Sequence, residues 1–306
     1  MEFAEFDIKY RIIDTLTLPP YKGSTIRGAF GNIFRKVVCP FKNKECNECL
    51  VSTKCVYTYI FETPVPQGAK IMRKYEHAPH PFIIEPPLDN KTRYERDEEL
   101  NFKLILIGKA IDYLPYFIYA FEMIGEKGIG RERKKIKLTS IAQKKGLLYD
   151  ADTKLLKQKV ISQKIDFSVP KQKIKTIKIE FQTPTRIVYQ GIILRNPEFY
   201  KISPNLLRRL FLISYFHCDS LLDINFNALL EKAKAIKTNL EYFEYKQLER
   251  FSSRQNKKIP MDGFVGTVIY EGDLTPFYPY LKAGEVLHIG KGTAFGMGKY
   301  RMLVLL

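Results

Sequence analysis

The two halves of this 306-residue chain repeat one order of strand and helix patterns, and each half ends near a glycine-rich, basic loop. In the first half, apolar residues alternate over 3–13, and a helix with one apolar face begins near Ser24. In the second half, a strand pattern over 174–181 precedes a long helical pattern over 204–222. Further strands are expected near 70–75, 80–86, 101–108, 242–251, 263–270, 285–289 and 299–305, and further helices near 110–124, 226–240 and 275–282.

The order strand, helix, two strands, helix, strand is that of the ferredoxin-like, RRM-like fold, so we predict an α+β fold with two such domains in tandem. The basic stretch 150–172 lacks strong periodicity and is the expected boundary. The predicted domains are 1–168, with a four-cysteine insertion at 39–55, and 169–306, with a glycine-rich loop at 290–298. RRM-type sheets commonly bind single-stranded RNA, but the fold alone is compatible with many functions.

The glycine-rich loop lies in the segment from Gly290 to Tyr300, which holds four glycines, two lysines and two aromatic residues. Glycine lets a backbone approach a ligand closely and lysine adds charge, so this composition favours contact with a polyanion. A P-loop would need glycine where Thr293 stands and Ser or Thr where Tyr300 stands. A dinucleotide fingerprint would need glycine at Phe295. The alternative is a glycine-rich hairpin that only connects two strands.

The charge of the chain points the same way. Lys and Arg outnumber Asp and Glu by 50 to 33, a formal net charge of +17, which predicts attraction to nucleic acid or to an anionic membrane surface. Residues 131–178 alone hold 15 basic and 4 acidic side chains. No apolar run approaches the roughly 20 residues that span a bilayer, and the N-terminus lacks the regions of a signal peptide. We therefore expect a cytoplasmic protein with no membrane partner.

Four of the five cysteines fall within one short, lysine-rich segment as Cys39, Cys46, Cys49 and Cys55. Disulfides are rare in the cytoplasm, and four thiolates suit tetrahedral zinc, so we predict a structural zinc ion. Two disulfides or an iron–sulfur cluster are the alternatives. A zinc ion with four thiolates would be closed to water and therefore not catalytic. Cys218 stands apart and is expected to be a buried apolar residue.

Five segments, in the right order, resemble the CRISPR repeat-cleaving endoribonucleases, the sixth Cas family of the RAMP superfamily. The chain is similar to a cysteine-containing subgroup with a C-terminal glycine-rich signature, and the resemblance spans nearly its whole length. The terminal signature is similar to 287–300 (LHIGKGTAFGMGKY), the first-helix motif to 25–30 (TIRGAF), the first glycine loop to 125–133, the central helix to Pro184 with 206–216, and the element before the final hairpin to 250–255 with Gly263 and Gly266.

This resemblance implies an enzyme that cleaves a CRISPR precursor transcript within each repeat to yield guide RNAs. It implies metal-independent attack of a ribose 2′-OH on the adjacent phosphate, which leaves a 2′,3′-cyclic phosphate and a 5′-OH, so no catalytic metal is required. The reaction needs a base for the 2′-OH, an acid for the leaving 5′ oxygen and positive charge at the phosphorane. The implied partners are precursor and processed repeat RNA and other CRISPR effector subunits; the sequence leaves a monomer and a homodimer open.

Two other function classes stay open. One is a non-catalytic RNA-binding RAMP subunit of a CRISPR effector complex, which the absence of a histidine on the first helix favours. The other is a zinc-dependent regulator that binds duplex DNA.

The first candidate for proton transfer is His288, because it stands two residues before the glycine-rich loop and members of the family often use a histidine. Its alternative is a half-buried structural residue in a strand. Family members often place catalytic side chains on or near the first helix, where this chain offers Tyr21, Lys22 and Arg27. The alternative for Arg27 is an ion pair with an acidic residue.

The other histidines are weaker candidates. His217 lies in an apolar helical pattern and is expected in the core, whereas His77 and His80 flank prolines and would contact RNA or water. A solvated hairpin face is the alternative for the basic residues after 249. The predicted RNA-binding residues are Gly290, Lys291, Gly292, Gly296, Gly298, Lys299, Arg131, Arg133, Arg250, Arg254, Gln255 and Lys257.

Overall fold

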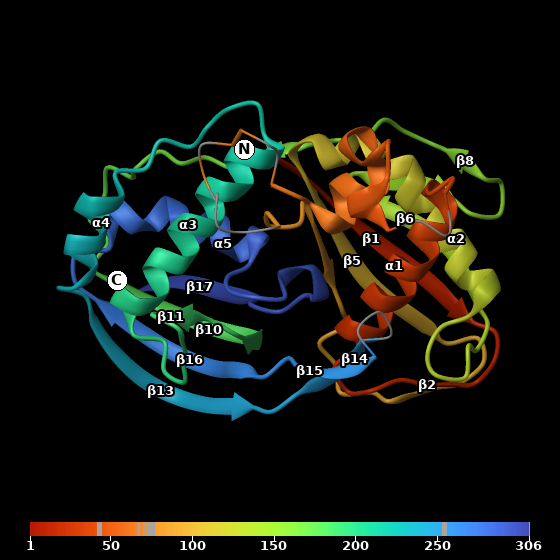
Figure 1. Ribbon diagram of the computed structural model, residues 1–306. Coiled ribbons are helices and arrows are strands. Elements are labelled where there is room, and N and C mark those ends of the chain that lie inside the picture. Colours follow the sequence, from red (N-terminus) through yellow and green to blue (C-terminus); the bar gives the residue numbers. More distant parts are fainter. Residues whose placement is uncertain (42–44, 66–67, 70, 72–76, 253–255, 306) are drawn as a thin grey trace. The chain divides into compact units, whose positions relative to one another are not determined.

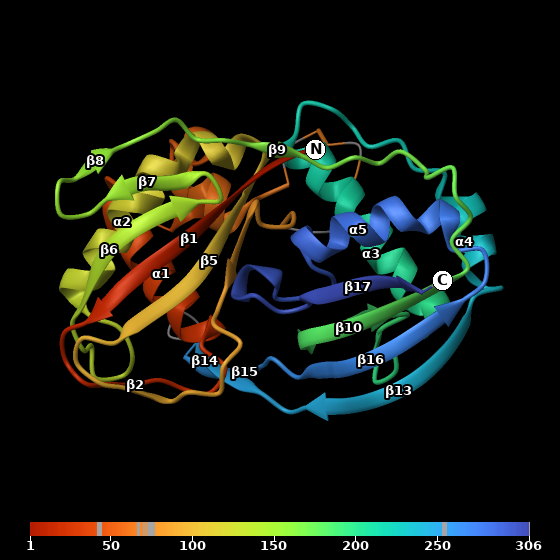
Figure 2. The ribbon, with the colours of Figure 1, turned by 180° about the vertical axis from the view of Figure 1, so that it is seen from behind.

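The computed structural model describes residues 1–41, 45–65, 68–69, 71, 77–252 and 256–305. Its contacts divide the chain into two units. Unit 1 comprises Met1–Lys164 and Phe216–Asp219, and unit 2 comprises Ile165–Tyr215 and Ser220–Leu306. Both units combine helices with antiparallel sheets (Figures 1 and 2). The domain limits at 168 and 169 stay a prediction, since the contact-based division also assigns the short segment after Tyr215 to unit 1.

Unit 1 is built on a sheet with the strand order β3-β5-β1-β6-β7-β8, and β9 also pairs with β1. The central strand β1 forms because Phe6, Ile8 and Tyr10 alternate with exposed charged residues and so present one apolar face. The strands are β1 (Glu2–Ile12), β3 (Phe82–Glu85), β5 (Glu99–Ile107), β6 (Ile136–Gln143), β7 (Gly146–Asp150), β8 (Leu155–Leu156) and β9 (Gln163–Lys164), with a separate pair β2 (Leu16–Thr17) and β4 (Arg93–Tyr94).

The helices α1 (Gly23–Val38) and α2 (Leu114–Lys127) cover one face of this sheet (Figure 1). The fully buried Phe30 of α1 lies at the centre of the core, with ring centroids 4.9 Å from Phe117 and 5.1 Å from Phe121 of α2. Aromatic rings at these separations add to the apolar area that they bury. The short helical turns of unit 1 are η1 (Cys46–Glu48), η2 (Ser52–Lys54), the π-helical η3 (Thr58–Glu62) and η4 (Gly108–Tyr113).

Unit 2 is built on a sheet with the strand order β13-β16-β10-β17. In its register, Ile179 lies opposite Val268 on one side and Met302 on the other, and all three are buried. The strands are β10 (Thr176–Thr185), β13 (Lys237–Lys246), β16 (Gly263–Glu271) and β17 (Tyr300–Leu305), with the pairs β11 (Val188–Tyr189) and β12 (Ile192–Ile193), and β14 (Glu249–Ser252) and β15 (Lys257–Pro260). The helices are α3 (Phe199–His217), α4 (Phe226–Ala233), η5 (Thr275–Phe277), α5 (Tyr278–Leu287) and η6 (Thr293–Phe295).

The four main strands of each unit follow the same spatial order. Numbered along the chain within each unit, they are arranged second, third, first, fourth, as β3-β5-β1-β6 in unit 1 and β13-β16-β10-β17 in unit 2. A helix follows the first main strand and another follows the third, as the sequence patterns predict. Among the described residues, no helix combines the length and the apolar character that a membrane span requires.

Three expectations differ from the structure. The helix expected over 226–240 ends at Ala233, and residues from Lys237 onward form β13 because their backbone pairs with β16. The strand expected over 285–289 is wrong: α5 continues to Leu287, with Leu281, Gly284 and Leu287 buried at helical spacing. Strands β8 and β9 lie in the basic stretch 150–172, where no strand was expected, and β7 ends at its first residue, Asp150. The strand expected over 70–75 falls mostly outside the described residues.

Candidate nucleic-acid interface and active site

In unit 2, the glycine-rich loop at 290–298 and the residues directly beside it use most of their backbone donors for the local fold. The N–H of Gly290 donates to Asn205 Oδ1 (3.1 Å), that of Lys291 to the carbonyl of Arg186 (2.7 Å), and that of Gly298 to the carbonyl of Pro184 (3.1 Å). The N–H groups of Phe295, Gly296 and Lys299 also donate within the protein, to Gly292, Thr293 and Thr183. These six donors build the loop, so the loop offers a ligand side chains more than backbone N–H groups.

Two glycines of the loop are required by close backbone contacts. A Cβ on Gly298 would lie 1.8 Å from the carbonyl oxygen of Ile289, and one on Gly290 would lie 2.4 Å from that of Arg186. Both residues also have positive φ, +74° and +85°. The glycine pattern that is prominent in the sequence therefore specifies a tight chain crossing.

His288 holds this crossing in place. Its side chain is fully buried, and Nδ1 donates to the carbonyl of Met297 (3.0 Å) across the loop. Its backbone ends α5 with φ +58° and ψ 171°, a conformation that residues other than glycine rarely adopt. A buried imidazole that ties the two ends of the loop together argues against the proton-transfer role predicted from the sequence.

Arg209 and Asn205 of α3 are positioning residues that the sequence analysis did not single out. The buried Arg209 guanidinium donates to the carbonyl of Leu287 (2.8 and 3.0 Å) and to that of His288 (3.1 Å), the residues where α5 ends. Burial lowers the pKa of Arg209 to about 9. Asn205, one helical turn earlier, accepts from Gly290. A charged residue inside the apolar pattern of α3 was the signal available in the sequence.

Basic side chains surround the loop on the surface of unit 2. Lys291 is exposed on the loop, and the Arg250 guanidinium lies over the ring of Phe295, 4.8 Å from its centroid. Lys257 is exposed, and Lys299 is partly exposed. Arg186 pairs with Asp262, which also accepts from the hydroxyl of Tyr245. The predicted contacts Arg254 and Gln255 lie outside the described residues.

The first glycine loop, in unit 1, is closed by mutual backbone bonds between Ile129 and Lys134 (2.9 and 3.0 Å). Gly128 has φ +82°, and a Cβ there would lie 2.1 Å from the carbonyl oxygen of Arg133. The side chains of Arg131 and Arg133 are exposed on this loop. The structure thus presents two arginines to solvent at the position where the sequence predicts RNA contact.

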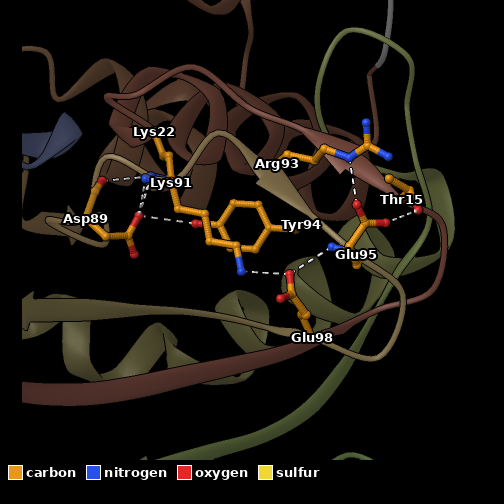
Figure 3. A network of polar contacts seen from close by, with 8 residues as sticks. All are labelled: Thr15, Lys22, Asp89, Lys91, Arg93, Tyr94, Glu95 and Glu98. Atoms are coloured by element: carbon orange, nitrogen blue, oxygen red, sulfur yellow. Dashed lines mark hydrogen bonds and ion pairs between the residues drawn. The ribbon is translucent and has the colours of Figure 1, made fainter.

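Lys22, at the start of α1, is buried in a polar network rather than exposed (Figure 3). Its ammonium donates to Asp89 Oδ1 (2.8 Å) and to the carbonyls of Asp89 (3.0 Å) and Pro20 (3.3 Å), and it faces the ring of Tyr94. Burial opposes ionisation of Asp89, but the hydrogen bond and charge of Lys22 outweigh it and lower the pKa of the carboxyl. The arrangement fastens the 86–92 segment to the start of α1.

Tyr21 and Arg27 lie near the same end of α1. Burial raises the pKa of Tyr21, and the charge of Glu85 raises it further, so its hydroxyl keeps its proton. Arg27 is a partly exposed residue, and its guanidinium lies over the ring of Phe61, 4.7 Å from the centroid. Phe61 belongs to η3, so Arg27 connects α1 with this π-helical turn.

The η3 turn and the residue after it carry the side-chain contacts of three histidines. His77 Nδ1 lies 2.6 Å from the carbonyl oxygen of Glu62, and His80 Nδ1 lies 3.2 Å from the hydroxyl of Thr63. His217, which is counted with unit 1, lies 3.2 Å from the hydroxyl of Tyr59. His217 is buried, as the sequence predicts. No local pattern in the sequence predicts that distant histidines would meet at one turn.

The four cysteines of 39–55 are partly exposed thiols. Burial raises the pKa of Cys46, as does the charge of Glu62, whereas Arg35 lowers it. Cys55 and Cys39 also raise it, so both of these thiols lie within electrostatic reach of Cys46. In the described part of the chain, no three His, Cys, Asp or Glu side chains are arranged to hold one metal ion. Zinc at the cysteines stays a prediction.

The N-terminal half identifies the family. Residues 1–162, more than half of the chain, match the model of a family described as the AF_1859 N-terminal domain. The chain belongs to the AF_1859 family. Residues 179–300 match the model of the CRISPR-associated endoribonuclease Cas6, so this AF_1859 family member carries a Cas6-like second half. The second match supports a relation of residues 179–300 to Cas6; the RAMP superfamily, the cysteine subgroup and the terminal signature stay predictions.

Solved Cas6 structures share the fold over nearly the full chain. A Cas6 product complex superposes with a TM-score of 0.62 at 14% identity, covering 98% of this chain and all of that one. A Cas6 of Thermus thermophilus gives a TM-score of 0.57 at 15% identity, with 98% of each chain covered. A partial Cas6-RT-Cas1–Cas2 complex gives 0.56 at 12% identity, covering all of this chain and 46% of that one. These likenesses show the fold.

An uncharacterized protein of Archaeoglobus fulgidus is 28% identical over 137 residues. The match covers 44% of this chain and 45% of the relative, so the chain matches less than half of that protein's length.

Proposed function

We propose that this AF_1859 family member is an endoribonuclease that binds CRISPR precursor transcripts and cleaves them within their repeats to yield guide RNAs. The observation that carries the proposal is the match of residues 179–300 to the Cas6 endoribonuclease family. The likeness of the fold to a Cas6 product complex over 98% of the chain supports it. The net charge of +17 provides the long-range attraction that an RNA ligand requires.

The proposed reaction is the metal-independent attack of a ribose 2′-OH on the adjacent phosphate. Arg27 is proposed to offset the charge of the phosphorane, because it is a partly exposed residue whose guanidinium is oriented by Phe61. Tyr21 keeps its proton and is proposed to donate a hydrogen bond there. We assign Lys22 and His288 to positioning, because both side chains are fully buried and hydrogen-bonded to loops of their own unit.

The proposed RNA contacts lie on both units. In unit 2 they are Lys291 and Lys299 on the glycine-rich loop, Lys257, and Arg250 on its Phe295 ring. In unit 1 they are the exposed Arg131 and Arg133. Lysine and arginine contacts of this kind bind the phosphate backbone and make affinity depend on salt.

We also propose that both units are ferredoxin-like folds, which the shared strand order supports.

The four cysteines are proposed to bind structural zinc, since four thiolates form a complete tetrahedral set. Metal analysis of the purified protein tests this: one zinc per chain is expected, and Cys46→Ser with Cys49→Ser should reduce it. A metal-free protein with an unchanged melting temperature would rule it out. Other CRISPR effector subunits are proposed partners.

Incubation with the cognate repeat RNA in EDTA tests the proposed function. One cut per repeat is expected, with a 2′,3′-cyclic phosphate on one product and a 5′-OH on the other. A repeat with a single 2′-deoxy nucleotide at the cleavage position should bind equally well and stay intact, because it lacks the nucleophile. Tight binding of the unmodified repeat without cleavage would instead indicate a non-catalytic RNA-binding subunit. Preference for duplex DNA over repeat RNA would indicate a regulator.

A further inference from the structure

The end of η3 organises a pair of imidazoles in unit 1. π-Helical turns are rare in proteins, and those that occur are often found at functional sites. Thr63, directly after η3, has φ +40°, a left-handed conformation that is strained for a β-branched residue. The carbonyl of Thr63 accepts from the N–H of Ala78 (2.7 Å), and the hydroxyl of Thr63 donates to the carbonyl of Ala78 (2.9 Å). These two bonds bring the segment 77–80 alongside the turn. The strained turn and this segment together form the site.

Both imidazoles are held in one tautomer by these contacts. The carbonyl of Glu62 can only accept, so His77 must donate from Nδ1. The hydroxyl of Thr63 gives its proton to Ala78, so it accepts from Nδ1 of His80. In the neutral form, each ring therefore carries its basic lone pair on Nε2. A histidine whose Nδ1–H is fixed by the protein presents Nε2 for proton transfer, as in a catalytic triad.

Exposure separates these two histidines from the other two. His77 is exposed and His80 partly exposed, whereas His217 and His288 have relative exposures of 2% and 0%. Nε2 of His217 donates to the carbonyl of Pro79 (2.7 Å), so that ring serves the packing of the site. Of the four imidazoles of the chain, His77 and His80 are thus the ones placed at the surface of their unit.

A cation is linked to His80 through two aromatic rings. The His80 ring stacks on Phe82 with centroids 5.8 Å apart, the tilted rings of Phe82 and Phe61 have centroids 5.3 Å apart, and the Arg27 guanidinium lies 4.7 Å from the Phe61 centroid. This series of ring contacts places one permanent positive charge two rings away from His80 in unit 1. RNA cleavage by 2′-OH attack needs a base, an acid and a cation.

We infer that His77 and His80 are the proton-transfer groups of the RNA cleavage, an inference that rests on the function proposed above. Nε2 of one histidine takes the proton of the 2′-OH as the bond between the 2′ oxygen and phosphorus forms. The other histidine, protonated, gives its proton to the 5′ oxygen as the bond between phosphorus and that oxygen breaks. The products are a 2′,3′-cyclic phosphate and a 5′-OH, and a proton exchange with water restores both imidazoles.

Asparagine variants separate proton transfer from a structural role. The side-chain amide of His77→Asn can replace the hydrogen bond from Nδ1 to the carbonyl of Glu62, and that of His80→Asn can replace the bond to the hydroxyl of Thr63. Neither amide has the basic Nε2 of histidine. Each variant should lower the single-turnover cleavage rate by about 10²–10⁴-fold, while its Kd for repeat RNA and its melting temperature stay close to those of the wild type. Full cleavage rates in both asparagine variants would overturn the inference.

A repeat with a bridging 5′ sulfur at the scissile position then assigns the two roles, because a thiolate leaves without being protonated. Cleavage of this substrate should be restored in the variant that lacks the acid and stay slow in the variant that lacks the base. Equal rates of the two variants on both substrates would contradict a division into acid and base. If the wild type binds the repeat but does not cut it, the proposed function fails and this inference fails with it. If the wild type and both variants cut it equally, only the inference fails.

Discussion

The glycine-rich loop of unit 2 and the η3 site of unit 1 place histidine in opposite environments. Next to the loop, His288 is fully buried and its ring donates a hydrogen bond to the carbonyl of Met297, which connects the two ends of the loop. At η3, His77 and His80 are fixed through Nδ1 and lie at the surface of their unit. The segment with the most recognisable sequence pattern thus uses its histidine to hold its own fold, whereas a segment without such a pattern carries two histidines at the surface of its unit.

The largest expected effect concerns the glycine crossing. Gly298→Ala should lower the free energy of unfolding by about 3 kcal/mol or more, because left-handed strain of about 1–2 kcal/mol adds to overpacking of about 1–3 kcal/mol. Gly191→Ala is the matched control, since its φ of +82° is similar but no atom lies within 4 Å of its added Cβ. That variant should lose only the strain term of about 1–2 kcal/mol. Denaturant unfolding measures both; equal losses would show that crowding at Ile289 does not specify the loop.

His288→Ala tests whether the loop is only a scaffold. Removal of the buried ring leaves the carbonyl of Met297 without this donor and should lower the free energy of unfolding by about 2 kcal/mol. The cleavage rate per folded molecule should stay within about threefold of the wild type, because the reaction would not pass through this ring. His288→Asn, which keeps a donor at the Nδ1 position, should recover part of the stability. A loss of 100-fold or more in rate with an unchanged Kd would return proton transfer to His288 and break the comparison.

Much of the fold was readable from the sequence, because apolar periodicity reports local structure directly. The alternation at Phe6, Ile8 and Tyr10 predicted β1, and the spacing of Ile26, Phe30 and Ile33 predicted α1. Apolar periodicity does not predict elements whose secondary structure depends on pairing with a distant strand. Residues after Lys237 form a strand only because β16 offers a partner, a fact that no local pattern contains.

The candidate site was less predictable for the same reason. The burial of His288 and Lys22 depends on residues far along the chain, Arg209 and Asp89 among their neighbours. The position of the histidine pair depends on the hydrogen bond between Thr63, the residue after the π-helical turn, and Ala78, which lies fifteen residues further along the chain. Spacing in the sequence identified which residues are basic or nucleophilic, but it did not show which of them lie at the surface.

The Lys22–Asp89 pair offers a pH test of a buried residue near α1. The pKa of Asp89 is lowered in the folded state, so its stabilising contribution is present above the ordinary carboxyl pKa of about 4 and is lost as pH falls through the lowered value. Asp89→Asn should cost about 1 kcal/mol at pH 7, a low value because half of the Asp89 side chain is exposed and water screens it.

The difference between wild type and Asp89→Asn should therefore stay constant between pH 7 and about 4 and shrink as the pH falls below that value, as followed by urea unfolding at each pH. Asp152→Asn is the control, because its pair with Lys137 is exposed on both sides and should contribute little at any pH. A constant difference across the pH range would mean that Lys22 is held by the carbonyls of Pro20 and Asp89 and not by the carboxylate.

The smallest expected effect belongs to Lys291, an exposed lysine of the glycine-rich loop. If the loop only presents charge to the phosphate backbone, Lys291→Ala should weaken repeat binding by about threefold and reduce the slope of log K against log salt by about 1. The exposed Lys232 on α4, which is outside the proposed contacts, provides the control, and its alanine variant should leave both quantities unchanged. The cleavage rate at saturating enzyme separates the two regions: it should not change in Lys291→Ala, since the lysine would bind substrate and transition state equally. A fall in that rate with an unchanged Kd would instead place Lys291 at the reacting phosphate and make the loop part of the chemistry, so the smallest effect in affinity carries a decisive test of the comparison.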